Sequence, residues 1–542
     1  MKANPNRFWF IVLLLGWVFD FLFWEKPFGV NFVIYVTLCL ATGIFLLRAD
    51  GLRLTPRSSL LLFPIAFLTA QTFFRLEPMT VFLSVAMTIF LMGVFTMTYL
   101  GGRWMHYALL DYLFGYFRLF GSMLVRPLGF AAEVKRDQPQ SDALQPEGVS
   151  KRRPKRSSQF WSIVRGLVIA LPIVAIFASI LASADVVFAK RLDEFIKLFN
   201  IDNLPQYIFR LVYILVFAYA IAGTYLHAAH NTDEKISEDK PLLSAFLGFT
   251  ESAIVLGSVA FLFVAFVVIQ FQYFFGGQTN ISFTGYTFSD YARKGFGELV
   301  AVAFFSLLML LGLGSITRRE TEVQRRVFSS LGVALVGLVL VMLVSAFQRL
   351  VLYETAYGFS RLRTYTHVFM IWLALLLVVV VVLEILRRER SVAFVMLLAA
   401  FGFIVSLGLL NVDGFIVRHN IQRELDAQTK PSSYGRVELD QVYFVELSED
   451  AVPSLVNAFL DESLPGMVHE KIGAALVCKK YNEEITDPLP WQSFHFSRST
   501  AQRAYDRVEN SLASYKYIAT DFPFKVKAPS GAEYYCSQYY GD

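Results

Sequence analysis

The stretch "SDYARKGFGELVAVAFFSLLMLLGLG", Ser289–Gly314, ends in a run of sixteen residues without a charge, Leu299–Gly314. Arg293, Lys294 and Glu298 stand directly before that run. A helix needs about 20 mostly apolar residues to cross the hydrocarbon core of a bilayer. The stretch therefore predicts a transmembrane helix that begins with a charged cluster.

The composition of the whole chain agrees with this reading. Of 542 residues, 55% are hydrophobic and only 17% are charged, and Phe alone occupies 53 positions. Soluble domains carry about 25% charged residues, so much of this apolar surface must face lipid. The lipid bilayer is therefore the first expected partner. The net charge of +5 is small, and we expect no nucleic-acid partner.

Further apolar runs of similar length recur along the chain. They predict an all-α fold, a polytopic bundle of about eleven transmembrane spans with a small helical C-terminal domain outside the membrane. The expected spans are Phe8–Trp24, Phe28–Leu47, Ser59–Phe74, Met79–Leu100, Trp161–Ala184, Gln206–Ala229, Phe246–Phe275, Phe296–Ile316, Phe328–Phe347, Thr366–Leu386 and Val392–Leu410.

Arginine and lysine collect in alternate connections between these spans. Cytoplasmic loops of membrane proteins are enriched in these residues, so the N-terminus is expected in the cytoplasm. With an odd number of spans, the chain after Leu410 is then expected outside. The residues that set this orientation are Arg48, Arg53, Arg57, Lys135, Arg136, Lys151, Arg152, Arg153, Lys155, Arg156, Arg318, Arg319, Arg325, Arg326, Arg387, Arg388 and Arg390.

Two segments interrupt the pattern of spans. Between Trp104 and Phe130, polar residues fall on one helical face, which predicts an amphipathic helix in the membrane interface; a twelfth span is the alternative. Residues 133–158 lack apolar periodicity and predict a disordered basic linker. The expected segments are 1–103, 104–160, 161–411 and 412–542.

The C-terminal segment has an ordinary soluble composition with three helical patterns, and we expect it to be all-α. The chain has three cysteines, Cys39, Cys478 and Cys536, and their spacing matches no metal motif. Cys478 and Cys536 would both lie on the oxidising side under the expected threading. A disulfide between them is therefore one reading, and two buried thiols are the other.

Ionisable groups within spans are costly and are therefore candidates for function. The functional reading is a polar cavity or vestibule; the alternative is that the charges anchor helix ends. As a hypothesis, Glu251 or Glu298 pairs with an arginine near the start of the tenth span. The candidates from this argument are Asp20, Glu251, Gln270, Arg293, Glu298, Arg361 and Arg363.

Sequence motifs for catalysis are lacking throughout. There is no phosphate-binding loop, no nucleophile elbow and no dinucleotide fingerprint. We therefore predict no catalytic residue, no cofactor and no metal.

Four strings resemble the signature segments of a bacterial polytopic membrane family known as domain of unknown function 4173. They are "GLVIALPIVAIFASILASADVVFA" (Gly166–Ala189), "YARKGFGELVAV" (Tyr291–Val302), "YGFSRLRTYTHVFMIWLALLLV" (Tyr357–Val378) and "LNVDGFIVRHNIQR" (Leu410–Arg423). The resemblance implies an integral membrane protein of bacterial type without assigned activity. Its segments coincide with the charged helix mouths and suggest one polar layer, formed by Asp185, Arg293, Glu298, Arg361, Arg363, Asn411, Asp413, Arg418 and Asn420.

These observations favour a non-enzymatic scaffold or sensor in the bacterial cytoplasmic membrane. Its C-terminal domain would meet an envelope protein or a lipid. A transporter that uses Asp20, Glu251 and Gln270 is one alternative. A membrane enzyme acting on a lipid-linked substrate through Asp185 is another.

Overall fold

The computed structural model describes residues 4–101, 104–142, 204–230, 246–275, 296–388, 391–429, 438–484, 489–519 and 523–537, with seven single residues between 174 and 191. In this part of the chain, ten helical segments are long and apolar enough to cross a membrane. They are α1 (Pro5–Phe23), α2 (Val30–Ala49), α3 with α4 (Pro56–Ser59 and Leu62–Phe74), α5 (Pro78–Met97), α9 (Leu204–His230), α10 (Phe249–Phe275), α12 (Phe296–Ile316), α13 (Glu322–Tyr357), α14 (Arg361–Ile385) and α15 (Val392–Leu410).

These ten segments coincide with ten of the expected spans, and the helical fold class is confirmed. The remaining span, Trp161–Ala184, lies outside the described residues except for three single positions. The largest difference is α13, which has 36 residues where the apolar run predicted 20. Its helix is extended into polar sequence by a capping box, in which Thr321 and Gln324 bond each other's backbone.

The chain divides into two compact units. The first unit comprises residues 1–21 and 122–226. Here glycines allow close helix contact. A Cβ on Gly16 would lie 2.6 Å from the carbonyl oxygen of Ile214, and one on Gly223 would lie 2.4 Å from the Cα of Met123. Small residues of this kind are typical of helix interfaces in membranes.

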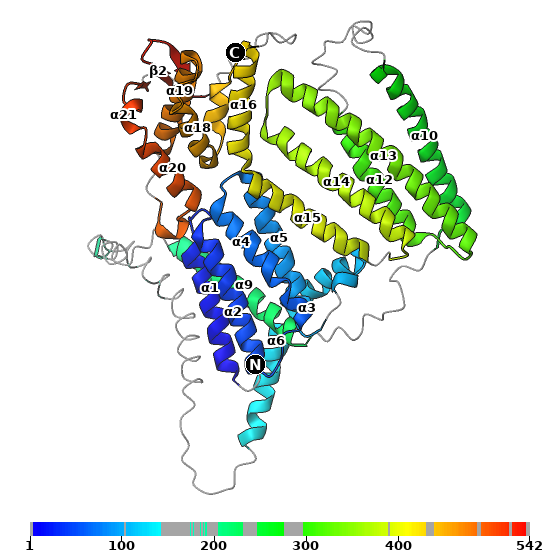
Figure 1. Cartoon of the computed structure of the whole chain (residues 1–542). Helices are drawn as coiled ribbons and strands as arrows, with labels where there is room; N and C mark the ends of the chain where they lie inside the picture. Colours follow the sequence, from blue (N-terminus) through cyan, green and yellow to red (C-terminus); the bar gives the residue numbers. More distant parts are fainter. Residues whose placement is uncertain are drawn as a thin grey trace. The chain divides into compact units, whose positions relative to one another are not determined.

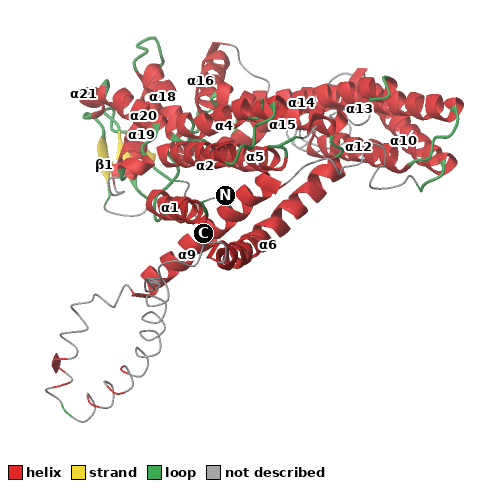
Figure 2. Cartoon of the chain, turned by 90° about the horizontal axis from the view of Figure 1, so that it is seen from below, coloured by secondary structure: helices red, strands yellow, loops and turns green. Residues whose placement is uncertain are grey.

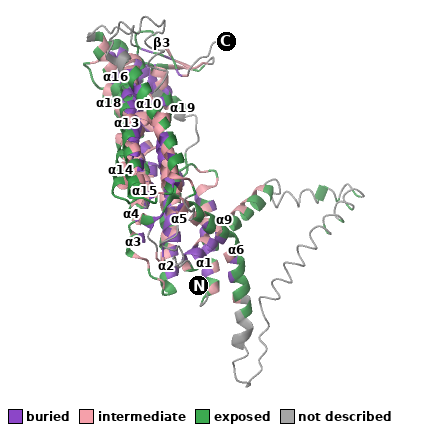
Figure 3. Cartoon of the chain, turned by 90° about the vertical axis from the view of Figure 1, so that its right-hand side faces the viewer, coloured by how far each residue is buried: buried purple, intermediate pink, exposed green. Residues whose placement is uncertain are grey.

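The second unit comprises residues 22–121 and 227–542. Helices α10, α12, α13 and α14 lie side by side in it (Figure 1) and share one apolar cluster centred on Leu335, Val339 and Leu343. The buried positions alternate with exposed apolar ones along these helices (Figure 3). Exposed apolar side chains on helices of this length are what a lipid environment requires.

The amphipathic segment after α5 is a single helix, α6 (Leu109–Asp142), preceded by the short helix η1 (Trp104–His106). It continues past Glu133, so the first ten residues of the predicted linker are helical rather than disordered. Residues 143–158 lie outside the described residues. Several large apolar side chains of α6 are exposed, including Phe117 and Val125. Arg126 donates from Nε to Ser122 Oγ over 3.0 Å on the polar face.

The C-terminal domain is mostly helical. The prediction that it is all-α is wrong, because a small sheet follows its helices. Its helices are α16 (Val412–Thr429), α17 (Gln441–Glu446), η7 (Glu449–Ala451), α18 (Val452–Phe459), α19 (Gly466–Glu484), η8 (Trp491–Ser493), α20 (Phe496–Asp506) and α21 (Glu509–Leu512). A three-stranded antiparallel sheet follows, in the order β1 (Lys516–Ile518), β2 (Lys525–Lys527) and β3 (Glu533–Tyr535), shown as the yellow strands of Figure 2.

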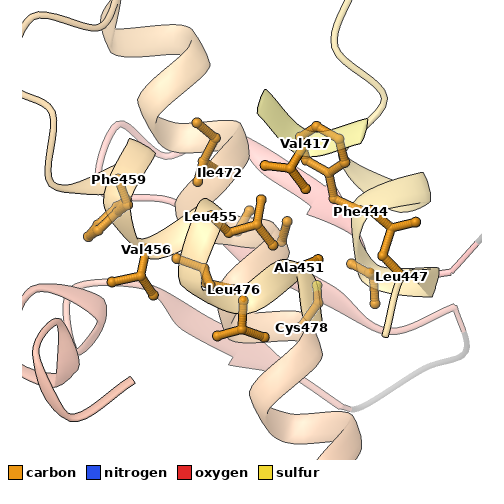
Figure 4. Close-up of a cluster of buried hydrophobic side chains, with 14 of the residues drawn as sticks. Val417, Phe444, Leu447, Ala451, Leu455, Val456, Phe459, Ile472, Leu476 and Cys478 are labelled. Carbon is orange, nitrogen blue, oxygen red and sulfur yellow. The ribbon is translucent and has the colours of Figure 1, made fainter. Parts of the chain in front are cut away.

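A buried apolar cluster holds this domain together (Figure 4). Phe444, Leu455 and Leu476 are fully buried in it. The structure joins Cys478 on α19 to Cys536, just after β3, in a disulfide with a Cα–Cα distance of 5.2 Å. The same cluster includes Leu407 of α15, so the C-terminal domain and the end of a membrane helix share one core.

Candidate functional site: a polar junction

Buried polar groups concentrate where the C-terminal domain meets the ends of the membrane helices. We call this layer the junction. It is formed by the turn between α4 and α5 (residues 75–77), the start of α14, the corner between α15 and α16, and the domain segments 448–454 and 491–500. All of these lie in the second unit.

The first contact of the junction is a buried ion pair. Arg361, at the start of α14, donates from Nε and Nη2 to the two carboxylate oxygens of Asp413 on α16, over 2.8 and 2.6 Å. The Asp413 side chain is fully buried. Asp413 also accepts the backbone N–H of Ser448, over 2.7 Å. A carboxylate with three donors is well satisfied, so this pair fixes the orientation of α14, α16 and the following domain.

The second contact ties the domain to the turn between two membrane helices. One oxygen of Asp450 accepts the backbone N–H groups of Leu76 and Glu77, over 2.7 and 3.0 Å. The other accepts the hydroxyl of Ser497, over 2.6 Å. Burial raises the pKa of the Asp450 carboxyl, while these donors and the nearby Arg75 act in the opposite direction. The carboxyl replaces the solvent that would otherwise bond these two amides.

Glu77 itself is buried and caps α5. Its carboxylate accepts the backbone N–H groups of Met79 and Thr80 over 3.0 and 2.7 Å. Pro78 occupies the first helical position, where its lack of an N–H costs nothing. The hydroxyl of Tyr365 on α14 donates to the same carboxylate. Glu77 thus links the start of α5 to α14.

The third contact is made by a neutral histidine. The N–H of Ser497 donates to Nδ1 of His495 over 3.1 Å, so the ring proton lies on Nε2. Nε2 is 3.0 Å from the carbonyl oxygen of Thr72, in the last turn of α4, and donates to it. Burial lowers the pKa of His495 from its usual value to about 4.

Two asparagines complete the junction. Asn411 adopts the left-handed conformation, with φ of 52°, and forms the corner between α15 and α16. Asn accepts this conformation more readily than most residues. Asn420 forms two hydrogen bonds with the backbone of Phe359. Its Oδ1 accepts the N–H over 2.6 Å and its Nδ2 donates to the carbonyl over 2.9 Å.

The structure brings together part of the polar layer suggested by the sequence. Arg361, Asp413, Asn411 and Asn420 lie in the junction, and Arg418 donates to Ser454 Oγ over 3.0 Å. Arg363 lies beside them, with its guanidinium 4.1 Å from the ring centre of Tyr353. Glu298 is exposed in the first turn of α12, and Arg293 lies outside the described residues.

The other candidates lie elsewhere. The carboxylate of Glu251 accepts the N–H of Gly248 over 2.8 Å at the start of α10. That end of α10 adjoins Thr317, at the far end of α12 from Glu298. Of the two pairings in the hypothesis, the one between Glu251 and an arginine near the start of α14 is therefore wrong, because these groups lie at opposite ends of the bundle.

Gln270 is buried in α10, and its Nε2 has no hydrogen bond to the residues that the structure describes. Two further candidates belong to the first unit. Asp20 forms a two-bond ion pair with Arg210 of α9, over 3.0 and 2.5 Å. Asp185 accepts the N–H of Phe188 over 2.9 Å.

The sequence analysis missed Glu77, Asp450 and His495. One signal was present for Glu77, because a carboxylate directly before a proline is typical of a helix start. No local signal could have found the contacts of Asp450 with Leu76 or of His495 with Thr72, which join residues more than 370 positions apart in the chain. Among the described residues, no three His, Cys, Asp or Glu side chains are grouped as a metal site requires.

The opposite end of the second unit is rich in arginine. We call it the arginine end. Arg319 pairs with Glu384 and Arg387 with Glu322, each over 2.5 Å. Trp104 donates to the carbonyl of Arg57 over 3.1 Å and contacts Phe394 at the start of α15. Helices α2, α5, α13, α14 and α15 each run between this end and the junction end.

These features define a class, a multi-pass membrane protein with a C-terminal domain docked on its helix ends. The model of the family described as "Domain of unknown function (DUF4153)" matches residues 59–458, and the chain belongs to that family. The family number differs from the one suggested by the sequence segments, while the absence of an assigned function is common to both. No curated protein and no solved structure matches the chain.

Proposed function

We propose that this chain is a scaffold or sensor of the bacterial cytoplasmic membrane, with its N-terminus in the cytoplasm and its C-terminal domain outside. The domain would present a surface to an envelope protein or a lipid, and the junction would hold it in a defined orientation on the membrane helices.

Two features at opposite ends of the second unit support this orientation. The Cys478–Cys536 disulfide belongs to the C-terminal domain, and disulfides persist in oxidising compartments. The arginines of the other end fit the rule that cytoplasmic loops are rich in Arg and Lys. Both features favour the same direction of threading.

The observation that carries the proposal is the bonding of Asp450 to the turn between α4 and α5. Burial of the Asp450 carboxylate is costly because the group loses its hydration. The hydrogen bonds to the two amides of the membrane hairpin offset this cost only while the domain is docked. A shift of the domain would therefore disturb its contacts with α4, α5 and α14, as a sensor or scaffold requires.

The three carboxylates assigned to the alternatives have structural partners. The carboxylate of Asp20 is engaged by Arg210, and that of Glu251 caps its own helix. Asp185, assigned to an enzyme, caps a local turn. We therefore favour neither transport nor catalysis.

Hydrogen exchange of the full chain in lipid nanodiscs tests the docking. In Asp450→Leu, the amides of Leu76 and Glu77 lose their acceptor, so we expect faster exchange both in the 76–80 turn and in α17 and α18. Asp450→Asn serves as the control. Its Oδ1 can accept the two amides and its Nδ2 can donate to Ser497, so exchange should remain near the original rate.

Rates that rise in α18 alone, with the 76–80 turn unchanged, would show that the domain folds separately from the membrane hairpin. That result would overturn the proposal. An equally large effect of Asp450→Asn would also contradict it, because the isosteric amide keeps the acceptor geometry.

A further inference from the structure

A cavity of about 490 Å³ opens at the junction, within the size range of ~300–1,000 Å³ typical of ligand sites. It lies between α4, the end of α15, the start of α18 and α20. Its lining residues are Phe67, Ala70, Gln71, Phe74, Arg75, Gly408, Leu409, Asn411, Asp450, Pro453, Phe496, Ser497 and Thr500.

The apolar part of this lining continues onto the surface that faces lipid. Leu409, in the last turn of α15, is 71% exposed, and Phe74 of α4 is 46% exposed. Phe496 of the C-terminal domain packs against Phe74 with ring centres 5.1 Å apart and is itself partly exposed. A wall made by two membrane helices and one domain aromatic gives an acyl chain a path from the bilayer into the cavity.

Two further exposed aromatic side chains lie shortly before Phe496 in the chain. Trp491, in η8, and Phe494, directly after it, are 58% and 52% exposed. The Phe494 ring lies 5.9 Å from that of Phe73, and its carbonyl accepts the N–H of Val30 at the start of α2. Aromatic residues are enriched at the level of lipid headgroups. We therefore expect this part of the junction at headgroup depth.

One cation stands at the polar part of the cavity. Arg75 donates from Nε to the carbonyl of Gly408 over 2.7 Å. Within the described residues it makes no ion pair, and its terminal nitrogens have no hydrogen bond. The neighbouring Asp450 is already engaged by three donors. The guanidinium thus has donors left for a phosphate oxygen, the partner that its geometry favours.

We propose that this cavity binds one phospholipid of the surrounding bilayer, with an acyl chain against Ala70 and Leu409 and its phosphate at Arg75. The site deepens the proposed function, on which its role as the lipid-sensing element rests. Occupation would place a lipid in contact with α4, α15 and the C-terminal domain at once.

Native mass spectrometry of the full chain, released from detergent after mild delipidation, tests the site. Ala70→Trp fills the cavity, and we expect at least a fivefold loss of retained phospholipid. Ala66→Trp is the matched control, because Ala66 is one turn earlier on α4, exposed and outside the lining. Retention by Ala66→Trp should equal that of the original chain.

Equal retention in the Ala70→Trp and Ala66→Trp proteins, or none in the original chain, would overturn the proposal. Titration back with phosphatidylglycerol, phosphatidylethanolamine or diacylglycerol then tests the headgroup. We expect both phospholipids to bind and Arg75→Gln to weaken them severalfold. Tight binding of diacylglycerol, unaffected by Arg75→Gln, would contradict the role of the phosphate.

The two proposals fail separately. The docking of the domain is read by exchange in the Asp450 variants, which needs no lipid in the cavity. The lipid site is read by the mass of retained phospholipid in the Ala70→Trp variant, in which Leu76, Glu77 and Ser497, the hydrogen-bond partners of Asp450, are not substituted.

Discussion

Single residues at the junction carry buried charges, and their arrangement decides what each substitution does. Asp413 is fully buried and has Arg361 as its charged partner. Removal of one member of such a pair leaves an uncompensated charge, which costs about 3–5 kcal/mol. Exposed pairs contribute about 0–1 kcal/mol, because water screens them.

We therefore expect Arg361→Met to lower the unfolding free energy of the detergent-solubilised protein by about 3–5 kcal/mol. Arg387→Met is the control, because Arg387 and Glu322 form an ion pair with side chains 60% and 55% exposed. Its effect should stay within about 1 kcal/mol. Denaturant titration measures the unfolding free energy of both variants. Equal losses in the two would contradict the structural role of the Arg361–Asp413 pair.

His495 predicts a pH dependence of docking. Its folded-state pKa, about 4, lies below the unfolded value of 6.5. Its contribution to stability is therefore fully present above pH 6.5 and is lost as the pH falls toward 4. Between pH 7 and pH 4.5 we expect a loss of about 2–3 kcal/mol from this residue.

Thermal unfolding at a series of pH values measures this loss. In His495→Asn, which has no titrating ring, the drop in unfolding free energy between pH 7 and pH 4.5 should be smaller by that amount. The raised pKa of Asp450 acts in the opposite sense, because its stabilising effect is greatest at low pH and is lost as the pH rises. An unchanged drop in His495→Asn would show that the ring does not titrate in this range.

Arg361 was a candidate because it is a charged residue beside an apolar run, and Asp413 because it lies in a segment that resembles a membrane family. Sequence reasoning could not pair them, since i,i+4 spacing does not relate residues of different helices. Asp450 was not among the candidates. Its actual role depends on a turn 373 positions earlier in the chain, which no local pattern encodes.

Helices in the first unit pack through glycine, which gives a prediction at the scale of elements. In Gly223→Val, the new side chain would meet the backbone of Met123 and force α9 away from α6. Overpacking of this kind costs about 1–3 kcal/mol.

Gly129 of α6 provides the control, because a Cβ there has nothing within 4 Å. Heating the solubilised variants and following aggregation by size-exclusion chromatography compares them. Gly129→Val should behave like the original chain, and a Gly223→Val protein of equal stability would show that the close approach of α6 and α9 is not required.

The disulfide predicts a second effect at this scale, because it closes a loop with a sequence separation of 58 between α19 and the strand region. In the chain-entropy model its loss costs about 4 kcal/mol. We expect Cys536→Ser to speed hydrogen exchange in β2 and β3, while Cys39→Ser, which alters a thiol that is not in the disulfide, should not. Identical exchange rates in the two variants would show that the disulfide does not stabilise β2 and β3.

The elements that sequence reasoning located best are the long apolar helices, because bilayer thickness imposes a length that is easy to recognise. The short strands were missed for the opposite reason. Lys516–Ile518 has three residues, too few to show alternation, and it follows directly on a helical pattern.

At the scale of the second unit, one apolar cluster runs from α15 into the C-terminal domain. Buried carboxylates at the junction fix the domain to the helix ends. This arrangement makes the orientation of the domain inseparable from that of the membrane helices. We expect a threading in which the domain and its disulfide lie outside and the arginine end lies in the cytoplasm.

Labelling of intact cells with a membrane-impermeant maleimide shows on which side of the membrane the C-terminal domain and the arginine end lie. In a Cys39→Ser background, Met467→Cys adds one thiol at a position that is 58% exposed in the C-terminal domain, and Val323→Cys adds one at a position that is 70% exposed at the arginine end. We predict labelling of Met467→Cys in intact cells and of Val323→Cys only after permeabilisation. The reverse pattern would contradict the account.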